Sequence, residues 1–229
     1  MSLLQLSPAL WITILATVVS GIIFVLVFLR YSIYSKNKDA ILFIGPCGAG
    51  KTALSYKVCY DCFPDTTTSI KAGKYILSRG NSKSVPVIDF PGHPKLRSQV
   101  NEYLSRARRI VFVVDASKIQ TQAREAAEFL YDLFTNPLLE NGPPMLIACN
   151  KSDIPGSRPP PRVKLAIQQE LDKIKKTRQS MEIVGDNESV SLGREGQPFS
   201  IERDPPIKVS FASISGKSAA LDELYAFLE

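Results

Sequence analysis

Residues 45–52 read Gly45-Pro46-Cys47-Gly48-Ala49-Gly50-Lys51-Thr52 and match the pattern G-x-x-x-x-G-K-[ST]. An apolar run at 40–44 precedes them, and residues compatible with a helix follow at 53–58. Glycines let the backbone bend so that successive N–H groups point into one cup, which holds phosphate oxygens. Lys51 would contact the β- and γ-phosphates, and the Thr52 hydroxyl would ligate Mg²⁺. The pattern therefore predicts a strand, a phosphate-binding loop and a helix that begins at Lys51.

The composition indicates a globular protein with room for one ordinary domain and an appendage. The chain has 229 residues, of which 45% are hydrophobic and 22% charged, and its net charge is +6. The basic residues are spread along the chain, with no nucleic-acid-binding signature among them. We therefore predict no direct nucleic-acid binding.

The four cysteines do not make a secreted disulfide framework in a chain of this size. Cys59 and Cys62 are spaced as C-x-x-C, but a zinc site would need two further ligands, and the only histidine is His93. We expect both thiols to be structural and to lie on the helix after the phosphate-binding loop. Reduced cysteines fit a cytosolic domain.

Residues 9–29 contain no charged side chain and are mostly apolar. About 20 apolar residues at 1.5 Å rise match a hydrocarbon core of roughly 30 Å, so this segment predicts one transmembrane helix. The alternative is a cleaved signal peptide. Its apolar core is usually shorter and follows a basic start, whereas residues 1–8 hold no Lys or Arg.

The charges beside this helix predict its orientation. Arg30, Lys36 and Lys38 flank only its C-terminal end, which the positive-inside bias places in the cytosol. We therefore expect a short lumenal N-terminus at 1–8, a transmembrane helix at 9–29, a basic cytosolic linker at 30–38 and a globular domain at 39–229.

The globular part alternates between strand and helix patterns, which predicts an α/β domain with a mostly parallel six-stranded sheet flanked by helices. Strands are expected at 41–45, 74–78, 85–89, 110–115, 145–149 and 207–212, and helices at 121–135, 162–178 and 218–228. The polar, glycine-containing segment 178–206 breaks this rhythm. We predict a surface insertion there.

A second motif follows the third expected strand, at the sheet edge where open parallel sheets bind ligands. Asp89-Phe90-Pro91-Gly92 fits D-x-x-G. In this pattern Asp89 reaches Mg²⁺ through water, and the Gly92 N–H meets the γ-phosphate. On its own the motif is weak, because an aspartate before a turn with glycine is common in loops.

Two further motifs indicate the base of the nucleotide. Asn150-Lys151-Ser152-Asp153 follows the fifth strand and fits N-K-x-D, and Ser215-Gly216-Lys217 follows the sixth. A buried Asp153 carboxylate can accept two hydrogen bonds from the guanine N1–H and 2-amino group, which adenine cannot supply. A backbone N–H of the last loop can meet the guanine O6. The motifs together predict GTP or GDP with Mg²⁺ as ligands, and Asn150 to Asp153 argue against a phosphate-loop kinase or ATPase.

In this order the motifs resemble those of Ras-like small GTPases, over residues 39–229. The chain is also similar to the signal recognition particle receptor β subunit family, in which one N-terminal transmembrane helix precedes an Arf-like GTPase domain. The segments that carry this likeness are 65–70, 89–93, 110–115, 127–131 and 146–151. Arf proteins themselves are less similar, because residue 2 is Ser2 and not the glycine that N-myristoylation needs.

The resemblance implies roles for two loop residues. It implies that Thr68 is a switch threonine that joins Thr52 and Asp89 at Mg²⁺, with Ser69 as the alternative one position later. His93 stands where Ras and Arf carry glutamine, and by analogy with translation-factor GTPases it would position the attacking water. GTP hydrolysis is expected to be slow and dependent on a partner.

The resemblance also implies a cellular role. The protein would be a membrane-anchored GTP-binding subunit that recruits the receptor α subunit to the endoplasmic reticulum membrane for co-translational targeting. The ribosome and the translocation channel would be further partners. Two alternatives remain open: a constitutively GTP-loaded membrane scaffold without a hydrolysis cycle, which His93 motivates, and a different membrane-tethered Arf-like GTPase.

Overall fold

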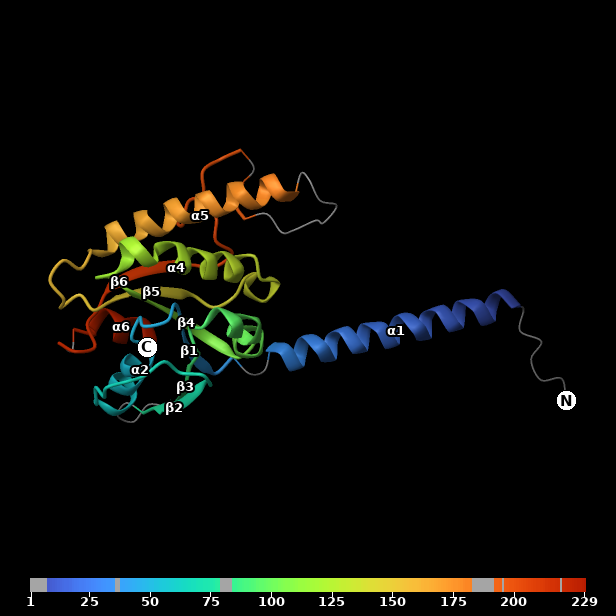
Figure 1. Cartoon of the computed structure of the whole chain (residues 1–229). Coiled ribbons are helices and arrows are strands. Elements are labelled where there is room, and N and C mark those ends of the chain that lie inside the picture. The colour runs from blue at the N-terminus through green and yellow to red at the C-terminus, as the bar shows by residue number, and fades with distance from the viewer. Residues whose placement is uncertain (1–7, 36–37, 79–83, 183–191, 195, 219) are drawn as a thin grey trace. The chain divides into compact units, whose positions relative to one another are not determined.

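The computed structural model describes residues 8–35, 38–78, 84–182, 192–194, 196–218 and 220–229. These residues form two units, Met1–Lys38 and Asp39–Glu229, which are treated separately below (Figure 1).

The N-terminal unit contains the helix α1 (Pro8–Ser35). Its side chains are described at 11, 12 and 14–27 and are exposed there. In the described part of the chain, no helix is both long enough and apolar enough to cross a membrane. The structure therefore does not support the transmembrane helix predicted for 9–29.

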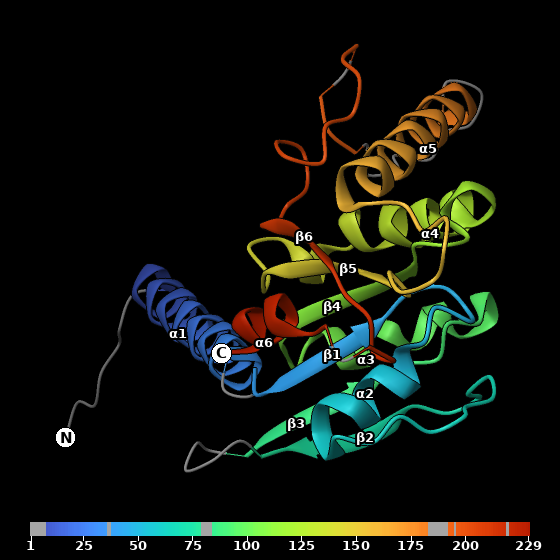
Figure 2. The same cartoon turned by 90° about the vertical axis from the view of Figure 1, so that its left-hand side faces the viewer.

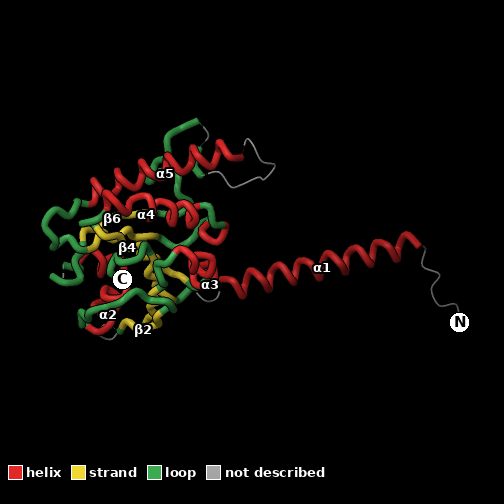
Figure 3. Tube along the Cα trace, viewed as in Figure 1, coloured by secondary structure: helices red, strands yellow, loops and turns green. Residues whose placement is uncertain are grey.

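The second unit is built on a six-stranded sheet with the order β2-β3-β1-β4-β5-β6. Figure 3 shows its strands in yellow. Only the edge strand β2 is antiparallel, to its neighbour β3, and the other pairs are parallel. The strands are β1 (Ala40–Ile44), β2 (Gly73–Leu77), β3 (Val85–Asp89), β4 (Ala107–Asp115), β5 (Met145–Asn150) and β6 (Val209–Ser213). The predicted mostly parallel α/β sheet is confirmed.

Helices cover both faces of this sheet (Figure 2). One face packs against α2 (Lys51–Tyr60) and α6 (Asp222–Leu228). The other packs against α3 (Val100–Leu104), α4 (Ile119–Phe134) and α5 (Pro160–Glu182). Two short 3₁₀ helices, η1 (Pro94–Gln99) and η2 (Pro137–Leu139), complete the described elements.

The alternation of side chains along β1 explains why this strand is apolar throughout. Ala40, Leu42 and Ile44 belong to the core on the α4 side, whereas Ile41 and Phe43 belong to the core on the α2 side. A central parallel strand is buried on both faces and therefore reads as a continuous apolar run. The phosphate-binding loop consequently starts from the rigid centre of the sheet.

The segment predicted as a surface insertion, 178–206, differs from that description in its described part. The helix α5 continues to Glu182, and Leu192, Phe199 and Ile201 are buried. Side chains of α5 also hold this backbone: the Phe199 N–H donates to Asp172 Oδ1 at 3.1 Å, and Lys175 Nζ donates to the Gln197 carbonyl at 3.0 Å. A few apolar residues in a polar stretch are enough to anchor it to the core.

The C-x-x-C pair also differs from the expectation. Cys59 lies within α2 and is partly buried, but Cys62 comes after the end of this helix and is exposed. Burial raises the pKa of the Cys59 thiol to about 11, so this thiol is protonated at neutral pH. Among the described residues, no group of three His, Cys, Asp or Glu side chains is placed to hold a metal ion.

Candidate functional site

The loop between β1 and α2 needs glycine for reasons of space and of backbone angle. Gly45 has φ of 137°, and a Cβ there would lie 2.2 Å from the Val113 carbonyl oxygen. Gly50 has φ of 89°, and a Cβ there would lie 2.6 Å from Asn150 Nδ2. Gly50 caps α2 without a side-chain hydrogen bond, so the first-turn N–H groups and the positive end of the helix dipole face this loop. This geometry suits an anion.

Lys51 lies inside the cup that the loop forms. Its side chain is buried, with the residue 7% exposed, and Nζ donates to the Pro46 carbonyl at 2.7 Å. Burial lowers the pKa of Lys51, although the charge of Asp89 opposes this. Gly92 lies close to the same ammonium group, because a Cβ at Gly92 would lie 2.7 Å from Lys51 Nζ. The D-x-x-G segment and the phosphate-binding loop therefore meet at this ammonium group.

The oxygen atoms predicted to surround Mg²⁺ lie together beside Lys51. Thr52 Oγ1 donates to Asp89 Oδ2 at 2.5 Å, and Ser69 Oγ lies 3.1 Å from Thr52 Oγ1. Asp89 is only 1% exposed, and its Oδ1 is buried without a hydrogen-bond partner in the described structure. Burial raises the pKa of Asp89 above its ordinary value. A hard cation with bound water would satisfy this oxygen, and oxygen donors are what Mg²⁺ prefers, so these residues fit the metal.

A cavity of about 330 Å³ opens beside these groups, within the size range of small-molecule sites. Its lining comes from the phosphate-binding loop, the segment 63–69, the D-x-x-G segment and one residue of the N-K-x-D motif. The lining residues are Cys47, Gly48, Gly50, Lys51, Thr52, Ala53, Phe63, Pro64, Asp65, Thr66, Thr67, Thr68, Ser69, Asp89, Phe90, Pro91, Gly92 and Lys151. Thr68 and Ser69 both line it, but the hydroxyl that contacts Thr52 belongs to Ser69.

The N-K-x-D motif joins three loops. Asn150 is buried; its Nδ2 donates to the Ala49 carbonyl at 2.9 Å, and its Oδ1 accepts from the Gly216 N–H at 3.4 Å. Lys151 Nζ donates to the Gly48 carbonyl at 2.8 Å. The phosphate-binding loop and the loop after β6 are thus tied together through the residues that follow β5.

Asp153 and Ser215 form the remaining part of the predicted base site. Ser215 Oγ donates to Asp153 Oδ1 at 2.5 Å and accepts from the Ser218 N–H at 3.0 Å. Ser215 is fully buried, but Asp153 is exposed. The expectation that the Asp153 carboxylate itself is buried is therefore wrong, because this residue lies in the open turn that follows β5. The hydrogen bond from Ser215 fixes the orientation of the Asp153 carboxylate.

His93 is not brought to the cavity. Its side chain is exposed, and its Nδ1 accepts a hydrogen bond from the Lys95 N–H at 3.2 Å, which caps the first turn of η1. The predicted role in positioning water would require this ring to turn. That role stays a prediction.

Two residues of the site were not predicted from the sequence. Asp115, at the end of β4, accepts from Lys151 Nζ at 2.7 Å and from Ser117 Oγ at 2.6 Å. Burial raises the pKa of Asp115, but these hydrogen bonds outweigh it, so its pKa lies below the ordinary value. Phe63 lines the cavity and packs against Gly216, where a Cβ would lie 2.7 Å from its ring. The available signals were an aspartate at the strand end beside N-K-x-D and an aromatic residue just after α2.

A family model and several known proteins match this chain. A family model described as "Signal recognition particle receptor beta subunit" matches residues 36–204. The signal recognition particle receptor subunit beta of Mus musculus is 34% identical over 216 residues, which cover 90% of this chain and 80% of the mouse protein.

Solved structures agree with this result. The structure of the mammalian SRP receptor matches with a TM-score of 0.73 and 34% identity, over 82% of this chain and 97% of that chain. A complex of SRb-GTP with SRX from Chaetomium thermophilum matches with a TM-score of 0.58 and 24% identity, over 78% of this chain and 90% of that chain. At this lower identity the second match shows the shared fold.

Proposed function

Because this chain belongs to the signal recognition particle receptor β subunit family, we propose that it recruits the receptor α subunit to the endoplasmic reticulum membrane in a GTP-dependent manner. Co-translational targeting of ribosomes to the translocation channel would follow from this recruitment. The observation that carries the GTP-dependent part of the proposal is the position of Asn150, which ties the phosphate-binding loop to the loop after β6. One buried side chain thereby sets the distance between the phosphate and base sites.

The proposed ligands are GTP or GDP with Mg²⁺. The phosphates would lie against residues 45–52, where backbone N–H groups, the α2 dipole and the Lys51 ammonium all favour negative charge. Thr52 would hold the metal directly, Ser69 or Thr68 would complete the site, and Asp89 would act through water. Bound Mg²⁺ would supply positive charge between the β- and γ-phosphates.

Guanine would be selected at the other end of the site. The Asp153 carboxylate, oriented by Ser215, would accept from the N1–H and the 2-amino group. The Gly216 N–H, which lies 3.4 Å from Asn150 Oδ1, would be shared with O6. Bound adenine would cover the Asp153 carboxylate without supplying these two donors, and the cost of leaving a covered carboxylate unpaired explains the rejection of adenine. Phe63, which packs on Gly216, would shield one side of the nucleotide.

We propose that the segments 63–69 and 89–99 form the surface to which the α subunit binds. Both line or adjoin the cavity, and the γ-phosphate is the group that would hold them together through the switch hydroxyl and the Gly92 N–H. GTP hydrolysis would release this surface. A protein of the same fold from Chaetomium thermophilum has been solved in its GTP form as a complex with SRX, which supports association with a partner in the GTP-bound state.

The direct test is a binding assay with the full-length chain in detergent, loaded with GTP or with GDP, and the purified receptor α subunit. We expect retention of the α subunit by the GTP form and much weaker retention by the GDP form. Equal retention by both forms would contradict the nucleotide dependence. No retention by either would favour the alternative of a different membrane-tethered Arf-like GTPase.

A second candidate is a constitutively GTP-loaded scaffold. The exposed position of His93, with Nδ1 engaged by Lys95, favours it over a catalytic role for this histidine. Single-turnover GTP hydrolysis by wild type and His93→Ala, each with and without the α subunit, distinguishes the two. A rate that depends on His93 in the presence of the α subunit supports a hydrolysis cycle, and a rate independent of both supports the scaffold.

For the N-terminal unit we propose a single membrane crossing, with residues 1–8 on the lumenal side and the GTPase domain in the cytosol. Residues 9–29 carry no charge, and described apolar side chains of α1, such as Trp11, Phe24 and Leu26, are exposed. Such a surface needs lipid or another protein to cover it. Glycosylation acceptor sites placed before residue 8 and after residue 39 test the topology. Modification of the first site alone is expected, and modification of the second would contradict it.

A further inference from the structure

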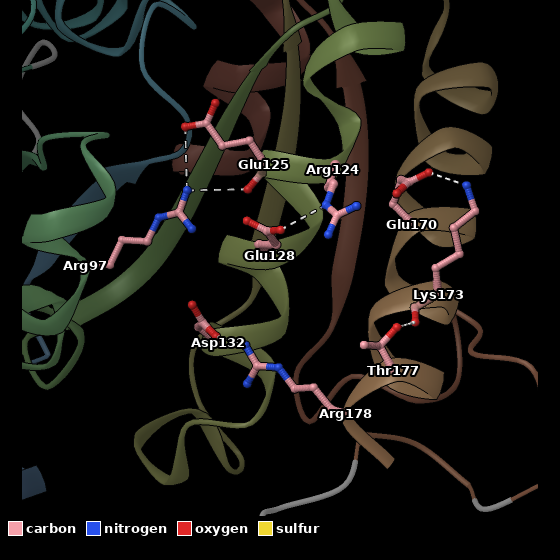
Figure 4. A network of polar contacts seen from close by, with 9 residues as sticks. All are labelled: Arg97, Arg124, Glu125, Glu128, Asp132, Glu170, Lys173, Thr177 and Arg178. Atoms are coloured by element: carbon pink, nitrogen blue, oxygen red, sulfur yellow. Dashed lines mark hydrogen bonds and ion pairs between the residues drawn. The ribbon is translucent and has the colours of Figure 1, made fainter. Parts of the chain in front are cut away.

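Arg97 attaches the segment after the D-x-x-G motif to α4. It lies in η1, which begins two residues after Gly92 and has no fully buried residue. The Arg97 side chain itself is only 12% exposed. Its Nη2 lies 3.6 Å from Glu125 Oε1 and 3.5 Å from the Glu125 carbonyl oxygen (Figure 4). Its guanidinium lies 4.7 Å from the centre of the Phe129 ring.

The contact between Arg97 and α4 is weaker than a similar contact that a second arginine makes with α4. Arg178 of α5 also contacts a carboxylate and an aromatic ring of α4. Its Nη2 lies 2.9 Å from Asp132 Oδ1 (Figure 4), and its guanidinium lies 4.3 Å from the Tyr131 ring centre. The Arg97 pair is longer, and Arg97 Nε is buried without a hydrogen-bond partner in the described structure. A buried donor left unpaired offsets part of what the other contacts contribute. The contact between Arg97 and α4 therefore contributes little net stabilisation and can break at a low cost in free energy.

The same segment reaches the phosphate site at its other end. A Cβ at Gly92 would lie 2.7 Å from Lys51 Nζ and equally close to the Cys47 nitrogen, so Gly92 is in close contact with the cup. Glu125 is also among the carboxylates whose charge acts on Lys51. The carboxylate of Glu125 thus lies near the arginine of the segment, and its charge also acts on the lysine of the phosphate site.

We propose that Arg97 is a latch: by holding η1 against α4 it keeps Gly92 beside Lys51, where its N–H is ready for a γ-phosphate. The inference rests on the proposed function and adds a regulatory residue to it. GTP and GDP differ by the γ-phosphate, so pre-organising Gly92 raises the affinity for GTP and leaves that for GDP nearly unchanged. Arg97 is a positioning residue in this account, since it acts through Gly92.

The test measures the affinities of the full-length chain for fluorescent analogues of GTP and GDP. We expect Arg97→Ala and Glu125→Gln each to lower the ratio of GTP affinity to GDP affinity by about fivefold or more. The exchanged pair, Arg97→Glu with Glu125→Arg, restores part of the ratio. Arg178→Ala, the matched control, removes a similar contact to α4 from a different element and leaves the ratio unchanged. Hydrogen exchange of the amides at 92–99 is expected to become faster in Arg97→Ala and not in Arg178→Ala.

Distinct results would overturn the latch and the proposed function. If the wild type binds both nucleotides but the ratio is the same in Arg97→Ala and Glu125→Gln, the latch is wrong and the proposed function stands. If the ratio of GTP affinity to GDP affinity falls as much in Arg178→Ala as in Arg97→Ala, the latch is wrong and Arg97 has only a general structural role. If the wild type binds neither nucleotide, the proposed function fails and the coupling through Arg97 fails with it.

Discussion

The hydroxyl oxygens of Ser69 and Thr52 lie 3.1 Å apart. Because Thr52 gives its only hydroxyl hydrogen to Asp89, Ser69 is the donor in this pair. The contact brings the segment 63–69 onto the proposed magnesium site. Of the two residues that the sequence left open as the switch ligand, Ser69 is thereby the better placed.

The first prediction concerns this choice. We expect Ser69→Ala to weaken GTP binding in the presence of Mg²⁺ by about tenfold, since a contact to a charged centre is lost. The effect should largely disappear when Mg²⁺ is chelated. Thr68→Ala is the matched control and should change the affinity less. A larger loss in Thr68→Ala, measured in the same titration, would assign the role to Thr68.

A second prediction uses two glycines with similar backbone angles. Gly50 has φ of 89° and Gly156 has φ of 85°, but a Cβ at Gly50 would lie 2.6 Å from Asn150 Nδ2, and at Gly156 it would meet open space. Alanine at either position should cost about 1 kcal/mol of unfolding free energy from backbone strain. Only Gly50→Ala should also abolish nucleotide binding, since it displaces Asn150. Denaturant unfolding and GTP titration of both variants check this, and equal GTP affinities would count against it.

A third prediction concerns the pH dependence of stability through Asp115. Burial raises its pKa, but the hydrogen bonds from Lys151 and Ser117 outweigh burial, so the folded pKa lies below the ordinary 3.8. A group with a depressed folded pKa stabilises the fold above its unfolded pKa, and this contribution is lost as the pH falls through the folded value. We expect Asp115→Asn to lower the unfolding free energy by about 2 kcal/mol at pH 7, and the difference to shrink below pH 3.8.

Urea unfolding of wild type and Asp115→Asn across this pH range, without nucleotide, makes the measurement. Asp89 has a shifted pKa in the opposite direction, but it is present in both proteins and cancels in the difference. Asp132→Asn, which changes a partly exposed carboxylate paired with Arg178, serves as the control and should have a small effect. If the difference in unfolding free energy between wild type and Asp115→Asn stays constant down to the lowest pH measured, Asp115 does not act through its charge.

The fold and the phosphate site could be predicted because they depend on short-range patterns. The apolar run of β1, the glycines and Lys51 are adjacent in the sequence, and the predicted start of α2 at Lys51 is confirmed. The alternation of strands and helices predicts a mostly parallel α/β sheet, and this agrees with the structure.

The rest depends on contacts between residues far apart in the sequence. The partners of Asp115 and the packing of Phe63 on Gly216 arise only when four loops meet at one edge of the sheet. The direction of the His93 ring depends on a local hydrogen bond to Lys95 that no motif specifies. Burial of Phe199 and Ile201 within a polar segment depends on α5, which presents Asp172 and Gln168 to that backbone.

The central claim is that this chain selects a guanine nucleotide, and competition between GTP and ATP tests it most directly. The full-length chain, with Mg²⁺ and a fluorescent GDP analogue bound, is titrated with each nucleotide. The account predicts that GTP displaces the analogue at a concentration at least about 100-fold lower than ATP, because adenine leaves the Asp153 carboxylate unpaired. Asp153→Ala should weaken the binding of GTP and remove most of the preference for GTP over ATP. Displacement by ATP at the same concentration as GTP would contradict the account.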